Sequence, residues 1–251
     1  MVRRLHRNIA GGFAVLAAGS VIALPSSLRL PVREASSVVA EADAINLKAT
    51  DLSASMHWLS APPGKSSKAS TALADQAVAC LQKVGPVSPD PFGTRTLIGG
   101  VVLADVSSPT YYEKGSSIEL PSASSEVVFL TTTSAAAADL STFGRGSALA
   151  CLTAQLIGNS TLGGAGKVKG SASYLAAPHY GGRSGGLHIR FIETAGNLGK
   201  SKLYDDEYCY VQGPAEISLS FIGLGAPFNA TWATSAISKV MARAQSEIGK
   251  S

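Results

Sequence analysis

The sequence is short of the features that mark several classes of protein. It has 251 residues, only 15% of them charged, with three cysteines and four histidines. The histidines do not cluster with cysteine at zinc-ligand spacing, so we expect no metal and no cofactor. Lysines and arginines do not gather with interleaved aromatic residues, which argues against binding to nucleic acid. Three cysteines permit at most one intramolecular disulfide.

The chain also lacks a hydrophobic run long enough for an ordinary membrane span. The uncharged run Ile9 to Leu24 holds about sixteen residues, whereas a transmembrane helix needs about twenty. Three arginines precede the run within the first seven residues, and Pro25 follows it. This plan predicts a signal peptide over residues 1–25, with Val21 and Ala23 suited to the cleavage site. The alternative is an uncleaved N-terminal anchor, which would be the chain's one contact with a membrane.

Several further properties depend on the leader. No cysteine lies just after the hydrophobic run, which excludes a bacterial lipoprotein anchor. Without its three arginines the chain carries 18 basic residues against 17 acidic ones, a net charge near +1. Residues 26–45 are rich in Ser, Ala and Val without clear period, and we expect a flexible tether. Residues 46–251 are enough for a single folded domain with one core.

Hydrophobic periodicity predicts the elements of this domain. Helices are expected over Ser70–Val84, Ala135–Leu140 and Ser147–Leu156, and after a cap at Asn229 or Thr231. Strands are expected over Leu97–Asp105, Val127–Thr133, Val168–Leu175, Leu187–Ile192, Glu207–Val211 and Glu216–Ile222. In the last strand Ile217, Leu219 and Phe221 alternate with polar residues, which favours an antiparallel sheet, and the last four strands form a meander. The predicted fold is α+β, an antiparallel sheet of about five to seven strands with three main helices packed on one face.

Two of the predicted helices resemble each other around a cysteine. Ala77 to Gln82 and Ala148 to Thr153 are identical at four of six positions, and each places one cysteine on its helix. Export to an oxidising compartment favours a bridge, so we expect a Cys80–Cys151 disulfide. Cys209 is left as a free thiol on a strand, where alternation favours its burial.

The order of elements, the leader, the two Ala-x-x-Cys-Leu helices and Asp51-Leu52 ahead of Trp58 resemble a known group of domains. These are actinobacterial secreted and lipoprotein-type domains, similar to the extracellular sensor domains of receptor Ser/Thr kinases and to Mog/PsbP-like α/β proteins. The resemblance covers most of residues 45–250. It implies an antiparallel sheet packed with helices, disulfide bracing, and a ligand-binding or partner-binding role. It assigns no functional residue to this chain.

Gly182 to Gly186 matches the G-x-S-x-G pattern of serine hydrolases. A hydrolase would use Ser184 as nucleophile, His188 or His179 as base, and Asp205 or Asp206 behind the base. However, the motif falls between two predicted strands instead of between a strand and a helix, and no histidine follows the acids. A glycine-rich turn of a hairpin is therefore the preferred interpretation.

Two further motifs have simpler interpretations than a binding site. Gly163 to Lys167 suggests a phosphate loop, but Val168 stands where Ser or Thr should bind magnesium, so we expect a plain loop. Asp205, Asp206 and Glu207 are consecutive acids without the spacing of a calcium loop, and a solvated turn is expected.

The sequence therefore favours an exported, non-catalytic, sensor-like domain that is secreted or held in the cell envelope. It would bind a small apolar ligand or an envelope partner in a pocket between helices and sheet. The alternatives are a serine hydrolase that uses Ser184 and a purely structural envelope protein.

Overall fold

A computed structural model gives the structure of the chain. It describes residues 35–63, 68–87, 102–115, 119–159, 169–180, 185–194 and 201–249. The predicted signal peptide lies outside the described residues, as do Ser184 and the loop from Gly163 to Lys167.

An antiparallel sheet of eight strands forms the centre of the described structure. Its strands are β1 (Trp58–Ala61), β2 (Val102–Ser107), β3 (Thr110–Glu113), β4 (Ser122–Leu130), β5 (Lys169–Leu175), β6 (Gly185–Thr194), β7 (Leu203–Gln212) and β8 (Ala215–Leu224). The order is β1-β3-β4-β8-β7-β6-β5, and β2 pairs with the same edge of β4 as β3. The last four strands follow one another across the sheet, so the predicted meander is confirmed. Gly213, with a φ of 56°, permits the tight turn between β7 and β8.

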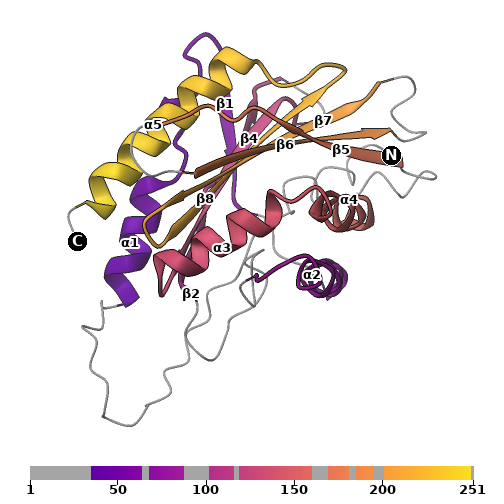
Figure 1. Cartoon of the computed structure of the whole chain (residues 1–251). Coiled ribbons are helices and arrows are strands. Elements are labelled where there is room, and N and C mark those ends of the chain that lie inside the picture. Colours follow the sequence, from indigo (N-terminus) through magenta and orange to yellow (C-terminus); the bar gives the residue numbers. More distant parts are fainter. Residues whose placement is uncertain are drawn as a thin grey trace.

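Helices cover both faces of this sheet (Figure 1). They are α1 (Ala35–Ile45), the short 3₁₀ helix η2 (Ala49–Asp51), α2 (Lys68–Leu81), α3 (Thr133–Phe143), α4 (Ala148–Asn159) and α5 (Ala230–Ile248). Helices α1 and α5 pack on one face, and α2, α3 and α4 lie over the other. We call these the α5 face and the α3 face. The α+β class and the antiparallel sheet are confirmed, but the prediction of three helices on one face is wrong.

The central strand β4 has apolar residues on both faces, so both faces of the sheet need to be covered by helices. It carries four consecutive apolar residues, Val127 to Leu130, and all four are buried. Val127 and Phe129 join the core under α1 and α5, whereas Val128 and Leu130 pack toward Ala136 of α3. A continuous apolar run of this kind is typical of a strand that is covered on both sides.

Helix α1 corrects the predicted tether. The tether was expected over residues 26–45, but from Ala35 onward the chain is helical and buries Val38, Ala42 and Ile45 in the main core. The next residues are held by hydrogen bonds to β4, because Ser125 Oγ donates to Asn46 Oδ1 and accepts from the Leu47 amide, both at 2.8 Å. The folded domain therefore includes the second half of the expected linker.

Helix α5 follows its sequence pattern closely. Asn229 caps it, accepting a hydrogen bond from the Trp232 amide at 3.1 Å. Its apolar stripe packs on the odd-numbered residues of β8, Ile217, Leu219 and Phe221. Trp58 stacks on Phe228 at 6.0 Å between ring centroids, at the rim of the same core. Trp58 is therefore a partly buried residue that packs against the core.

Candidate functional site

The disulfide joins the two cysteine-bearing helices. Cys80 of α2 and Cys151 of α4 are bonded with a Cα–Cα distance of 5.7 Å, and Cys209 is free, both as expected. Ala77 and Leu81 of α2 pack with Ala148, Cys151 and Leu152 of α4 against β6. The bridge therefore links α2 to α4, and apolar packing holds this helix pair on the α3 face. A disulfide is typical of proteins from oxidising compartments.

A polar cluster lies on the α5 face, where β6 meets β7. His188 Nε2 is 2.8 Å from Asp206 Oδ1. Arg190 forms a fork on the same carboxylate, with Nε donating to Oδ1 at 2.7 Å and a terminal nitrogen donating to Oδ2 at 3.1 Å. Burial acts to raise the pKa of Asp206, but the hydrogen bonds from His188 and Arg190 outweigh it and lower that pKa. The pKa of Arg190 is raised by the same contact with Asp206.

The surroundings of His188 matter for the hydrolase hypothesis. His188 is 5% exposed, and its imidazole ring stacks on Tyr208 at 4.0 Å between ring centroids. Its Nδ1 faces the carbonyl oxygen of Ala176 at 3.4 Å. Each ring nitrogen thus faces an oxygen, so His188 is oriented as a structural link between the segment after β5 and strand β7.

The other predicted members of a catalytic set are not brought together. Asp205 and Asp206 are neighbours in β7 and point to opposite faces of the sheet, so only Asp206 reaches His188. His179 is exposed, and Ser184 lies outside the described residues. The described residues therefore place a buried His–Asp pair where sequence reasoning looked for one, with Arg190 as an unforeseen third partner.

The α3 face carries a second polar cluster that sequence reasoning missed. We call it the carboxyl layer. Its members are Asp105 (β2), Glu126 (β4), Asp139 (α3), Glu193 (β6), Asp205 and Glu207 (β7) and Glu216 (β8). Glu126, Asp139, Glu193 and Glu207 are buried, and the rest are partly buried. The solvated turn expected at residues 205–207 is wrong, because these acids lie inside a central strand.

Strand register explains how the layer assembles. Glu207 lies beside Ser220 of β8, while Glu126 lies between Ser218 of β8 and Ser107 of β2. Two of these carboxyl groups accept a hydrogen bond from a serine hydroxyl. Ser220 Oγ donates to Asp205 Oδ1 at 2.9 Å, and Ser107 Oγ donates to Glu126 Oε1 at 3.3 Å. Acids that are far apart in the sequence, such as Glu126 and Glu207, thus meet on one side of the sheet.

Burial dominates the protonation of this layer. It raises the pKa of Glu126, Glu207 and Glu216 well above the ordinary value and that of Asp205 to about 7. Neighbouring carboxyls act in the same direction: Asp105 on Glu126, and Asp205 on Glu207. A raised pKa favours the protonated form of a carboxyl group, and a protonated carboxyl can donate a hydrogen bond to another carboxyl.

One of these pairs joins α3 to the sheet. Glu216 of β8 shares a side-chain hydrogen bond with Asp139 of α3, which is 1% exposed. The other oxygen of Glu216, Oε1, is buried without a hydrogen-bond partner. In the part of the chain that the structure describes, no group of three or more His, Cys, Asp or Glu residues is arranged to hold a metal ion. Within the layer, the Asp139–Glu216 pair is a contact between the helix and the sheet.

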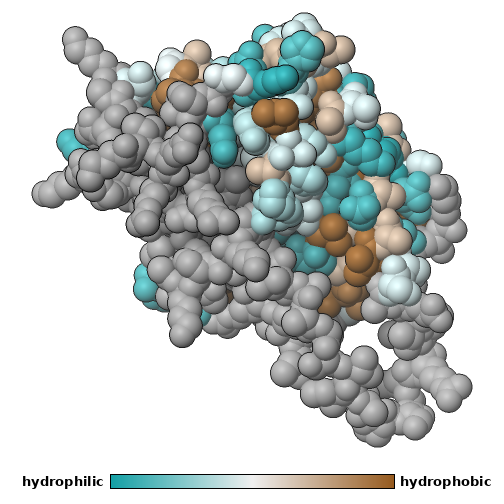
Figure 2. All heavy atoms as spheres, turned by 180° about the vertical axis from the view of Figure 1, so that it is seen from behind, coloured by the Kyte–Doolittle hydropathy of each residue, from teal (hydrophilic) through white to brown (hydrophobic). Residues whose placement is uncertain are grey.

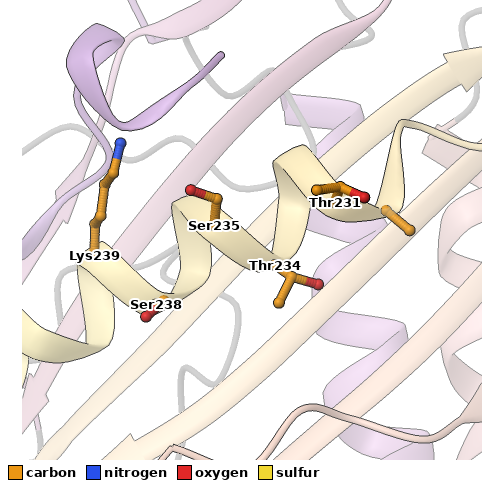
Figure 3. A pocket seen from close by; sticks show the side chains of 6 residues that line it. Thr231, Thr234, Ser235, Ser238 and Lys239 are labelled. Carbon is orange, nitrogen blue, oxygen red and sulfur yellow. The ribbon is translucent and has the colours of Figure 1, made fainter.

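The outer face of α5 forms a shallow, open hollow. It is lined by Ala230, Thr231, Thr234, Ser235, Ser238 and Lys239. Figure 3 shows their short side chains along the helix and the Lys239 chain reaching toward the segment of η2. Lys239 Nζ donates there to the carbonyl oxygens of Thr50 and Asp51 at 3.0 and 3.1 Å. The hollow is therefore lined by small uncharged side chains and by one charged residue, Lys239.

The described surface is mixed in polarity. Figure 2 shows hydrophobic residues in small groups among hydrophilic ones on the described part of this face. The most exposed large hydrophobic side chains are Val39, Leu59, Leu103 and Leu175, each about 40% exposed. Across the described helices, none is both long and apolar enough to span a bilayer.

Comparisons with known proteins add no relative. No protein-family model, curated protein or solved structure matches the chain.

Proposed function

We propose that this protein is an exported, non-catalytic, sensor-like domain that acts through contact with a partner in the cell envelope. The observation that carries the proposal is the closed environment of His188. Its two ring nitrogens face Asp206 and the Ala176 carbonyl, and Asp206 is also bound by Arg190. A general base needs an available nitrogen beside its nucleophile, whereas both ring nitrogens of His188 already face an oxygen.

The packing of the α5 face supports a surface partner over a small apolar ligand. Most of the largest fully buried side chains lie between the sheet and helices α1 and α5, among them Tyr210, Phe129, Phe221 and Met241. Interiors of this kind are close-packed, so a ligand would need to displace core side chains. On the α3 face, the interior holds carboxyl groups, which suit an apolar ligand poorly.

The first test separates binding from hydrolysis. The purified mature protein is treated with a serine-directed fluorophosphonate probe, beside the Ser184→Ala and His188→Gln variants. We expect no stoichiometric labelling of any of the three proteins. Stoichiometric labelling of the wild type at Ser184 that both substitutions abolish would contradict the proposal and support the hydrolase.

The second test asks what the protein holds in its natural setting. The protein is isolated from its own host under non-denaturing conditions and weighed by native mass spectrometry. A stoichiometric protein partner is the expected result. A small apolar molecule on the chain would support the ligand alternative, and a bare chain from intact envelope would support the purely structural one.

A further inference from the structure

Strand β5 forms one border of the sheet (Figure 1). It pairs with β6 on one side, and no strand of the described residues pairs with its other side. It has seven residues, whereas β1 at the opposite end of the sheet has four. An edge strand presents a row of unpaired backbone N–H and C=O groups, which are a template for a further strand. The outer side of β5 is therefore suited to pair with an extended peptide.

The α5 face of the sheet is uncovered beside this edge. Leu175 lies opposite His188 and Ser173 lies opposite Arg190, so the odd-numbered residues of β5 are on the α5 face. The core under α1 and α5 includes residues of β2, β3, β4, β7 and β8, but no described residue of β5 or β6. All four odd-numbered residues of β5 are consequently exposed: Lys169, Ser171, Ser173 and Leu175.

The neighbouring strands extend this exposed surface. Arg190 and Ile192 of β6 lie on the same face, and Tyr204 of β7 lies opposite Ile192. Lys202 directly precedes β7, and its carbonyl oxygen accepts a hydrogen bond from the Gly225 amide at 2.8 Å, so strand pairing extends to it. Alternation places Lys202 on the side of Tyr204. We call the surface formed by Lys169, Ser171, Ser173, Arg190, Lys202 and Tyr204 the open face.

The open face has an excess of positive charge. Lys169 and Lys202 are exposed, and neither forms an ion pair with a described residue. Arg190 uses Nε and one terminal nitrogen to bind Asp206, and its other terminal nitrogen has no hydrogen-bond partner among the described residues. The remaining acids of β5, β6 and β7 lie on the α3 face: Glu193, Asp205 and Glu207. Three cations thus stand against one carboxylate on this side of the three strands.

We propose that an extended acidic segment of the envelope partner adds to the sheet as a strand beside β5. Its main chain pairs with the outer edge of β5, and its alternate side chains, which are carboxylates, lie on the open face beside Lys169 and the short side chains of Ser171 and Ser173. Lys202 and Arg190 contribute to the positive potential that attracts them. This inference rests on the partner-binding function proposed above and names the surface and the chemistry of the contact.

Two other occupants fit these features less well. A second copy of the chain, paired through its own β5, would bring two positively charged faces together, and like charges across an interface disfavour association. A polyanion without a peptide backbone would match the charge but not the unpaired N–H and C=O groups of the edge. An acidic peptide satisfies both features.

Three synthetic peptides as long as β5, seven residues, test the proposal. One alternates glutamate with valine, one alternates lysine with valine, and the third is the glutamate peptide methylated at every backbone nitrogen. Binding to the purified protein is measured by fluorescence anisotropy. The glutamate peptide should bind at least about tenfold more tightly than either of the others, and its affinity should fall as salt is added. No binding of the glutamate peptide, or equal binding of its methylated form, would overturn the proposal.

Hydrogen–deuterium exchange and charge reversal locate the site. The glutamate peptide should slow amide exchange in β5 and leave β1 unchanged. Lys169→Glu with Lys202→Glu should weaken binding by about tenfold or more, because two attractive charges become repulsive. Lys114→Glu, an exposed lysine directly after β3, is the matched control and should bind as the wild type does. Protection that appears elsewhere without β5, or affinity unaffected by the double reversal, would overturn the proposed surface.

The double reversal also distinguishes a failure of this inference from a failure of the proposed function. Each variant is isolated from the natural host and weighed by native mass spectrometry. Loss of the protein partner from Lys169→Glu with Lys202→Glu, but not from Lys114→Glu, is the expected result. If the double variant keeps the partner, the open face is not the contact and this inference alone is overturned. If the wild type carries no protein partner, the proposed function is overturned as well.

Discussion

Arg243 of α5 holds Asp51 of η2 with both prongs of its guanidinium group. Its two terminal nitrogens donate to the two oxygens of the Asp51 carboxylate at 2.9 and 2.6 Å. The second of these nitrogens also donates to the carbonyl oxygens of Ile45 and Asn46 at 3.2 and 2.8 Å. One side chain therefore closes the C-terminal end of α1 and fastens it to the last helix.

Replacing Arg243 with lysine should destabilise the domain although the charge is kept. Lysine is a point donor and cannot reproduce the planar fork that reaches one carboxylate and two carbonyls together. We expect a loss of about 2 kcal/mol, a fall in Tm of roughly 4–8 °C for a domain of this size. Thermal unfolding followed by circular dichroism measures it. A Tm equal to that of the wild type would show that the fork contributes little.

The carboxyl layer should make the protein more stable at acidic than at alkaline pH. The pKa values of Glu126, Glu207, Glu216 and Asp205 are raised in the folded state. The stability they contribute is therefore fully present below the unfolded pKa near 4 and is lost as pH rises through the folded values, which for Asp205 means about 7.

Tm measured between pH 5 and pH 9 should accordingly fall by several degrees. Asp205→Asn should flatten the part of this profile around pH 7, because an amide does not ionise. Glu113→Gln serves as the control and should leave the slope unchanged. A Tm that rises steadily from pH 5 to pH 9 would count against a protonated layer.

The cluster at Asp206 should change the stability of the protein with pH in the opposite direction. Its pKa is lowered by its hydrogen bonds to His188 and Arg190, which outweigh burial, so its contribution to stability is present above the unfolded pKa and is lost in acid. Asp206→Asn should destabilise the protein at pH 7 by about 1–3 kcal/mol, because Arg190 and His188 lose a charged acceptor. The destabilisation should shrink toward pH 3. Urea unfolding at both pH values gives the comparison, and an equal loss at both would exclude an electrostatic origin.

The disulfide should be the main constraint on α2. The bridge spans 71 residues, and in the chain-entropy model its loss costs about 4 kcal/mol. Cys80→Ser with Cys151→Ser should lower Tm by several degrees and raise amide exchange in α2 more than in α5. Cys209→Ala, which breaks no bridge, is the control. Exchange that rises equally in both helices would show that the bridge stabilises the fold as a whole instead of holding α2.

Much of the architecture follows from local pattern. The 3.6-residue stripe of α5 and the alternation in β8 each bury one side of their element, so periodicity alone locates them. Gly144 and Gly146 lie between α3 and α4, and the similar sequences around Cys80 and Cys151 predict the disulfide that joins them. The sheet class, the meander and the cysteine pairing are therefore local information.

The carboxyl layer could not be found in this way. Asp205, Asp206 and Glu207 look like a solvated turn because consecutive acids are normally exposed, and no neighbour in sequence tells against it. The pattern in the sequence that indicates burial on both faces of the sheet is the run of four apolar residues in β4, Val127 to Leu130. Even so, alternation cannot say which acid meets Arg190 and which meets other carboxyls.

The sequence by itself determined the periodic elements and the pairing of Cys80 with Cys151, because helix stripes, strand alternation and cysteine chemistry are set by neighbouring residues. Only the tertiary structure decided that Asp206 is the partner of Arg190. It also decided that burial raises the pKa of Asp205, one residue away, to about 7. The physical reason is the strand period of two. The side chains of adjacent residues point to opposite faces of the sheet, and the groups that they contact on each face belong to strands and helices distant in the chain.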